Sequence, residues 1–128
     1  MTSNTNQALI REAGGCDVLL DALIQHMEEP SIANRASRAI GAMAVEEESR
    51  KILVENGACE LIIDTIQMYM ENEDVLIPCC WCISVLANDP SALPIISEKM
   101  NSTLSDEEVG LVLSIISNIS DYDPSNQS

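Results

Sequence analysis

The sequence contains no phenylalanine, one tryptophan and two tyrosines, and it has only six basic residues against 21 acidic ones. A core without phenylalanine must be built from aliphatic side chains, methionine and cysteine, which suits closely packed helices. The formal net charge of −15 argues against nucleic acid as a partner, because Lys and Arg contacts to phosphates dominate that affinity. It also argues against anionic membrane surfaces. The simpler interpretation is that acidity keeps the protein soluble, and the charge also permits a basic partner.

Signals for export or membrane insertion are missing as well. Residues 1–7 are polar and uncharged, whereas a secretory signal needs a basic segment and an apolar one. The most apolar stretch, residues 75–87, is far shorter than the roughly 20 residues that span a bilayer. Five cysteines are an odd number for a disulfide framework, so we expect a reducing compartment. These features predict a cytoplasmic or nuclear protein.

The stretch 75–87, VLIPCCWCISVLA, contains the only tryptophan and three of the five cysteines. It predicts a helix that is apolar on nearly every side, which would lie centrally in a layered structure or contact a partner. Pro78 removes a helical hydrogen bond. We therefore expect the regular helix to start at Pro78, after a looser turn from Asp74.

The chain repeats itself with a period of 43 residues. Without any gap, this shift pairs identical residues along most of the chain: Glu12 with Glu55, Gly14 with Gly57, Cys16 with Cys59, Asp21 with Asp64, Met27 with Met70, Glu28 with Glu71, Ile40 with Ile83, Ala44 with Ala87 and Ile52 with Ile95. A helical period of about 40 to 47 residues is typical of HEAT and armadillo arrays.

Each repeat is predicted to hold a short helix, a glycine turn and two longer helices. Apolar spacing and turn residues predict eight helices. One of them starts from a cap at Ser31 and runs to about residue 44, and one is the central stretch described above. The others cover residues 6–12, 16–27, 46–56, 58–70, 91–99 and 109–119. Ser105 and the acids after it predict the start of the last helix. Met100 stands where the earlier repeats have Gly14 and Gly57, and the long helix after it is missing.

This pattern resembles the armadillo-repeat family, through the segments EAGG at 12–15, ENGA at 55–58, ISVLA at 83–87 and ISNIS at 116–120. The resemblance implies an all-α fold, a right-handed alpha-alpha superhelix in one domain over residues 1–120. Its parts would be the end of a repeat (1–14), two full repeats (15–57 and 58–100) and a truncated one (101–120), before a flexible tail (121–128). HEAT repeats are the alternative, and the short helix that ends in glycine argues against them.

The resemblance also implies a function in protein binding. In this family the third helices line a concave groove that holds an extended or helical segment of a partner. At a four-residue spacing, the positions that would face it are Asn34, Arg38, Ala42, Ile77, Trp81, Val85, Gly110, Ser114 and Asn118. The import-adaptor branch has a Trp followed by an Asn four residues later, and no repeat here has both.

These features predict a non-enzymatic scaffold or adaptor that binds a protein or peptide. The alternative is an acidic receptor for basic peptides or proteins, similar to import adaptors or chaperones. The groove is expected to contain Arg38 and no acid, whereas six acidic residues are expected on the second helices, on the convex side: Asp17, Asp21, Glu28, Glu60, Asp64 and Glu71. Trp81 is either a binding anchor or part of the core.

The last predicted helix is apolar over more of its surface than one neighbour can cover. Leu111, Leu113, Ile115 and Ile116 could bury this surface in a homodimer. The alternative is that the chain is a fragment of a longer array, in which an adjacent repeat covers the helix.

Cys79 and Cys82 form a C-x-x-C pair, a pattern that is found in metal-binding sites and in redox-active sites. Zinc needs about four ligands, and neither a second such pair nor a histidine other than His26 is present. In the repeat, the cysteines at 79, 80 and 82 align with small residues of the preceding repeat, so buried packing is the simpler interpretation. We expect no metal, no cofactor and no enzymatic activity.

Overall fold

A computed structural model describes residues 14–119 of the chain. This part contains seven α-helices and no strand, which confirms the all-α prediction. The helices are α2 (Gly15–His26), α3 (Pro30–Met43), α4 (Glu47–Glu55), α5 (Ala58–Met68), α6 (Glu73–Leu86), α7 (Ala92–Thr103) and α8 (Asp106–Asn118). The helix predicted over 6–12 and the tail predicted over 121–128 lie outside the described residues.

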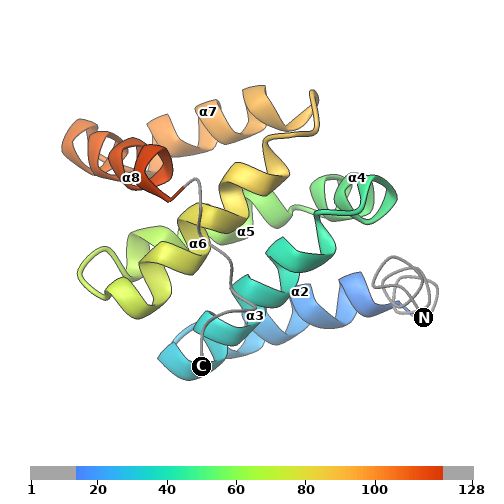
Figure 1. Cartoon of the computed structure of the whole chain (residues 1–128). Helices are drawn as coiled ribbons and strands as arrows, with labels where there is room; N and C mark the ends of the chain where they lie inside the picture. The colour runs from blue at the N-terminus through green and yellow to red at the C-terminus, as the bar shows by residue number, and fades with distance from the viewer. Residues whose placement is uncertain (1–13, 120–128) are drawn as a thin grey trace.

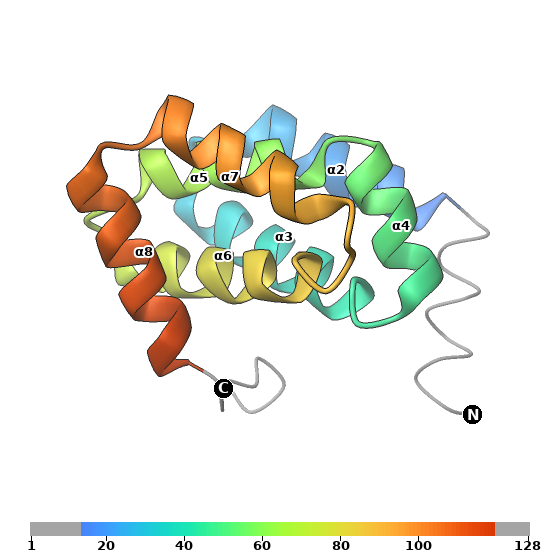
Figure 2. The ribbon, with the colours of Figure 1, turned by 90° about the horizontal axis from the view of Figure 1, so that it is seen from above.

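The helices are arranged in two layers (Figures 1 and 2). Helices α3 and α6 pack side by side in one layer, and α2, α5 and α7 lie in the other. Helix α8 packs against α6 at one end of the molecule, and α4 lies at the other end. Within the described residues, we find no helix with the length and apolar character needed to cross a membrane.

The 43-residue period of the sequence is also the spacing of the helix starts. Helices α2 and α5 begin directly after Gly14 and Gly57, and α3 and α6 begin at Pro30 and Glu73. Gly14 and Gly57 have φ values of 82° and 89°, in a region that costs residues with a Cβ about 1–2 kcal/mol. Glycine at these two positions therefore provides the left-handed conformation directly before a long helix.

The third repeat has Met100 at the position that Gly14 and Gly57 occupy in the earlier repeats, and the chain makes no turn there. Without a glycine to make the turn, α7 continues through Met100 to Thr103, four residues beyond the predicted end. The longer helix lies along α5, where Lys99 Nζ is 3.0 Å from Asp64 Oδ1 and Gln67 Nε2 donates to the Thr103 carbonyl at 3.0 Å. Helix α7 therefore takes the next place beside α5 in the layer of α2, α5 and α7, and the chain then continues into α8 (Figure 2).

Two predicted helix starts have opposite outcomes. Ser105 caps α8 in a full capping box, in which its hydroxyl accepts from the Glu108 N–H at 3.2 Å and the Glu108 carboxylate accepts from the Ser105 N–H at 2.8 Å. The prediction that Ser31 caps α3 is wrong. The helix begins one residue earlier, at Pro30, because proline suits a first helical position, where no N–H donor is needed.

The predicted start of the central helix at Pro78 is also wrong, since α6 runs without interruption from Glu73 to Leu86 with Pro78 inside it. Asn72 caps the helix by accepting the Asp74 N–H at 3.1 Å. The expectation that this helix is buried on nearly every side holds for eight of its 14 residues, Val75, Leu76, Pro78, Cys79, Cys80, Cys82, Ile83 and Leu86. Ile77, Trp81 and Val85 are half-buried and form a strip along one side.

Candidate partner-binding groove

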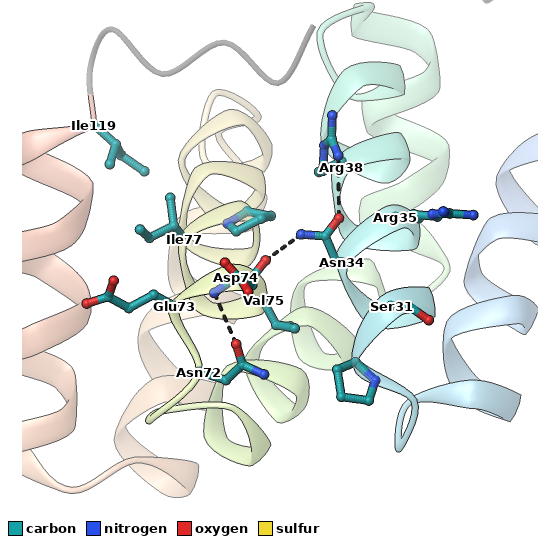
Figure 3. Close-up of a pocket in the computed structure, with 12 residues that line it drawn as sticks. Ser31, Asn34, Arg35, Arg38, Asn72, Glu73, Asp74, Val75, Ile77 and Ile119 are labelled. Atoms are coloured by element: carbon teal, nitrogen blue, oxygen red, sulfur yellow. Dashed lines mark hydrogen bonds between the residues drawn. The ribbon is translucent and has the colours of Figure 1, made fainter. Parts of the chain in front are cut away.

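An open groove with a volume of about 750 Å³ lies between α3 and α6 (Figure 3). Three of the residues predicted to line a binding groove meet here: Asn34 and Arg38 from α3, and Ile77 from α6. The other lining residues are Pro30, Ser31, Arg35, Asn72, Glu73, Asp74, Val75, Pro78 and Ile119. The groove therefore has polar, charged and apolar sections.

Asn34 holds the two helices of the groove together. Its amide nitrogen donates to the Asp74 carbonyl of α6, and its amide oxygen accepts from Arg38 Nη1 at 3.4 Å. Figure 3 shows the two bonds in sequence from Arg38 through Asn34 to the first turn of α6. The half-buried Arg38 is thus oriented along α3 by a side chain that is itself fixed to α6.

The expectation that the groove contains no acid is wrong, because Glu73 and Asp74 line it. Both residues are exposed and belong to the first turn of α6, where acids are favoured by the helix dipole. The sequence did carry a signal for Glu73. The four-residue spacing that selects Ile77, Trp81 and Val85 reaches Glu73 when it is extended by one step towards the N-terminus.

A second cavity, of about 360 Å³, lies between α6 and α8. Its lining is mainly apolar, with two carboxylates: Met70, Glu71, Glu73, Leu76, Ile77, Leu111, Ile115, Asn118 and Ile119. Sequence reasoning predicted Ile77 and Asn118 for a groove, and Leu111 and Ile115 for self-association. The structure brings these four residues together around one cavity.

Trp81 lies on the same strip of α6 but packs onto α3. A Cβ at Gly41 would lie 2.7 Å from Cε3 and 3.1 Å from Cη2 of Trp81, so the indole sits directly against the glycine backbone. The ring is half-buried. Ala42 is exposed and Val85 is half-buried, and neither lines the two cavities described above.

Helix α8 exposes most of its side chains. Only Val112 is fully buried, whereas Leu111 and Leu113 are 46% and 56% exposed. Ile115 and Ile116 are half-buried and pack against the core. Ser114 and Gly110 are exposed and line neither cavity.

The five cysteines, Cys16, Cys59, Cys79, Cys80 and Cys82, are buried. Burial raises the pKa of the Cys59, Cys79 and Cys80 thiols to about 12, and raises that of Cys82 well above its usual value. These thiols are protonated at neutral pH, whereas reactive cysteines need the thiolate. In residues 14–119, no three His, Cys, Asp or Glu side chains are grouped so that they could hold a metal ion.

Comparisons of the chain with protein-family models, with curated proteins and with solved structures find no match. The armadillo resemblance therefore stays a prediction, and a functional proposal depends on the geometry of the groove and on the internal repeat.

Proposed function

We propose that the chain is a short right-handed solenoid of the armadillo type that binds a segment of a partner protein and catalyses no reaction. The regular spacing of the helix starts supports this fold, because α2–α3 and α5–α6 repeat with the same 43-residue offset. Gly14 and Gly57, in the same left-handed conformation, mark the same turn in both units.

The observation that carries the function is the open groove between α3 and α6. Its lining residues include Asn34 and Arg38 on one helix and Glu73 and Ile77 on the other, each pair at a four-residue spacing along a single helix face. A lining that alternates donors, charges and apolar surface can hold a peptide backbone and select its side chains. The partner would be an extended segment lying across both helices.

A receptor for basic peptides is the second candidate, and one observation favours it. Glu73 and Asp74 line the groove, and the net charge of −15 would attract a cationic segment over a distance set by ionic strength. Arg35 and Arg38 on the opposite wall favour a partner of mixed charge instead.

Selection from a displayed library of random 12-residue peptides tests the proposal. We expect enriched peptides whose affinity falls at least about tenfold in Ile77→Ser, since a buried apolar contact is lost, and also falls in Arg38→Ala. Glu60→Ala is the matched control, because Glu60 is exposed on α5 and lines neither cavity. A library that yields no binder, or binders insensitive to both groove changes, would contradict the proposal. Steep salt dependence with uniformly basic binders would favour the second candidate.

A further inference from the structure

The two cavities are neighbours across α6. Glu73, Ile77 and Ile119 line both of them, and Figure 3 shows Ile77 and Ile119 facing each other while Glu73 extends from α6 towards α8. A segment lying in the α3–α6 groove can therefore continue over the first turns of α6 to the cavity beside α8.

The second cavity combines an apolar lining with negative charge. Leu76, Leu111 and Ile115 contribute apolar surface, and Glu71 and Glu73 contribute carboxylates. Both glutamates are exposed. In residues 14–119, Lys51 and Lys99 pair with Glu47 and Asp64, and neither Glu71 nor Glu73 forms an ion pair with a Lys or Arg of this part of the chain.

We propose that the cavity between α6 and α8 takes a large apolar side chain of the partner segment, and that Glu71 and Glu73 pair with a Lys or Arg next to it. The inference rests on the proposed function and specifies its partner. A volume of about 360 Å³ falls within the range of ligand pockets, roughly 300–1,000 Å³. The apolar side chain of the partner would be buried in the cavity. The adjacent Lys or Arg would form ion pairs with two carboxylates that have no basic partner in residues 14–119.

Backbone amide NMR titration of the full chain tests this pairing with three 10-residue probes. Each probe is a Gly/Ser peptide, and the three carry Leu-Lys, Leu-Glu or Ser-Lys at their centre. We expect the Leu-Lys peptide to shift the amides of Ile77, Leu111 and Ile115 most strongly. Its Kd should be about tenfold lower than that of the Ser-Lys peptide because the leucine is buried, and about fivefold lower than that of the Leu-Glu peptide.

A charge reversal makes the test specific. Glu73→Lys should abolish the preference between the Leu-Lys and Leu-Glu peptides, because it leaves one carboxylate, that of Glu71, and one ammonium group beside the cavity. Glu60→Lys changes the net charge by the same amount at an exposed position on α5 outside both cavities, and it should keep the original preference. Leu111→Ser should weaken both leucine peptides, and because Leu111 is 46% exposed this variant should remain folded.

Three results would overturn the inference. The first is equal binding of the three probes, and the second is a set of shifts that avoids α6 and α8. The third is a dimer by light scattering in which the same amides are protected from exchange, since a second copy would then fill the cavity. If library peptides still lose affinity in Ile77→Ser and Arg38→Ala, the proposed function survives the failure of this inference.

Discussion

The side-chain amide of Asn34 donates to the main-chain carbonyl of Asp74, and that carbonyl is the one which Pro78 leaves without its helical donor. In an α-helix the N–H of residue i bonds to the carbonyl of residue i−4, and proline has no N–H. The neighbouring helix thus supplies the donor that α6 lacks. This bond accounts for a proline inside the most buried helix of the chain.

Asn34→Ala should lower the free energy of unfolding by about 1 kcal/mol, the usual net value of such a hydrogen bond. In a Pro78→Ala background the helix regains its own N–H donor, so the same Asn34→Ala change should cost much less. Urea unfolding of the four proteins in this double-mutant cycle gives the coupling energy.

Arg38→Ala serves as the control for this cycle, because Arg38 also bonds to Asn34. If Asn34 acted mainly through Arg38, the two single variants would be equally destabilised and Pro78→Ala would leave the cost of Asn34→Ala unchanged. That pattern would contradict the role assigned to the Asp74 carbonyl.

Gly57→Ala should destabilise the protein by about 1–2 kcal/mol, because φ at this position is 89° and a Cβ disfavours that conformation. No atom outside the two adjacent residues lies within 4 Å of a Cβ at Gly57, so the cost is conformational and involves no clash with another part of the fold.

Gly110→Ala is the matched control for this change. Gly110 lies inside α8 with equally open surroundings, and alanine there should stabilise the helix by about 0.5–1 kcal/mol. Opposite signs in thermal unfolding would establish that backbone conformation, rather than space, separates the two glycines. Equal effects would contradict this explanation.

The glycines also show how far the sequence predicts the fold. The helices, their order and the 43-residue offset follow from apolar spacing and from Gly14 and Gly57, since these are local signals. The extension of α7 past Met100 depends on the absence of such a turn residue. The continuity of α6 could not be predicted, because the donor that makes Pro78 tolerable comes from Asn34, which lies 40 residues before the Asp74 carbonyl that it bonds.

Some residues of the candidate site could likewise be predicted from local spacing, and others could not. The four-residue spacing found Asn34, Arg38 and Ile77, because positions on one helix face stay on that face. It did not find the cavity beside α8, which forms only where Met70, Leu76 and Leu111 meet from separate segments. The spacing also placed Trp81 in the groove without showing that its ring packs on Gly41.

Gly41→Ala should displace the Trp81 ring, because the new Cβ would lie 2.7 Å from Cε3, well inside van der Waals contact. We expect a destabilisation of about 1–3 kcal/mol, as for other overpacked sites. Trp81 is the only tryptophan, so its fluorescence emission and near-ultraviolet circular dichroism report the displacement directly.

Trp81→Leu separates steric strain from other effects of the alanine. Combined with Gly41→Ala, it should remove most of the additional cost, because the smaller side chain leaves room for the methyl group. A Gly41→Ala protein with unchanged stability and tryptophan spectra would show that the indole does not rest on Gly41 in solution.

The buried thiols predict a loss of stability at alkaline pH. In the unfolded chain a cysteine titrates near its ordinary pKa of 9.0, whereas Cys59, Cys79 and Cys80 keep their protons up to about pH 12 in the folded state. The stabilisation is complete below pH 9 and is lost as pH rises towards 12, by up to about 1.4 kcal/mol per pH unit for each thiol. Urea unfolding at several pH values measures this slope.

The triple variant Cys79→Ala, Cys80→Ala and Cys82→Ala isolates the contribution of α6. It should be less stable than the wild type at pH 7, because small cavities replace the sulfur atoms, but its stability should fall less steeply above pH 9. In the wild type, a thiol reagent at pH 8 should modify the five cysteines only after denaturation, since each is buried. Rapid labelling of Cys79, Cys80 or Cys82 in the native protein would instead mean that α6 opens readily, and a helix that opens so easily could not provide the fixed wall of a binding groove.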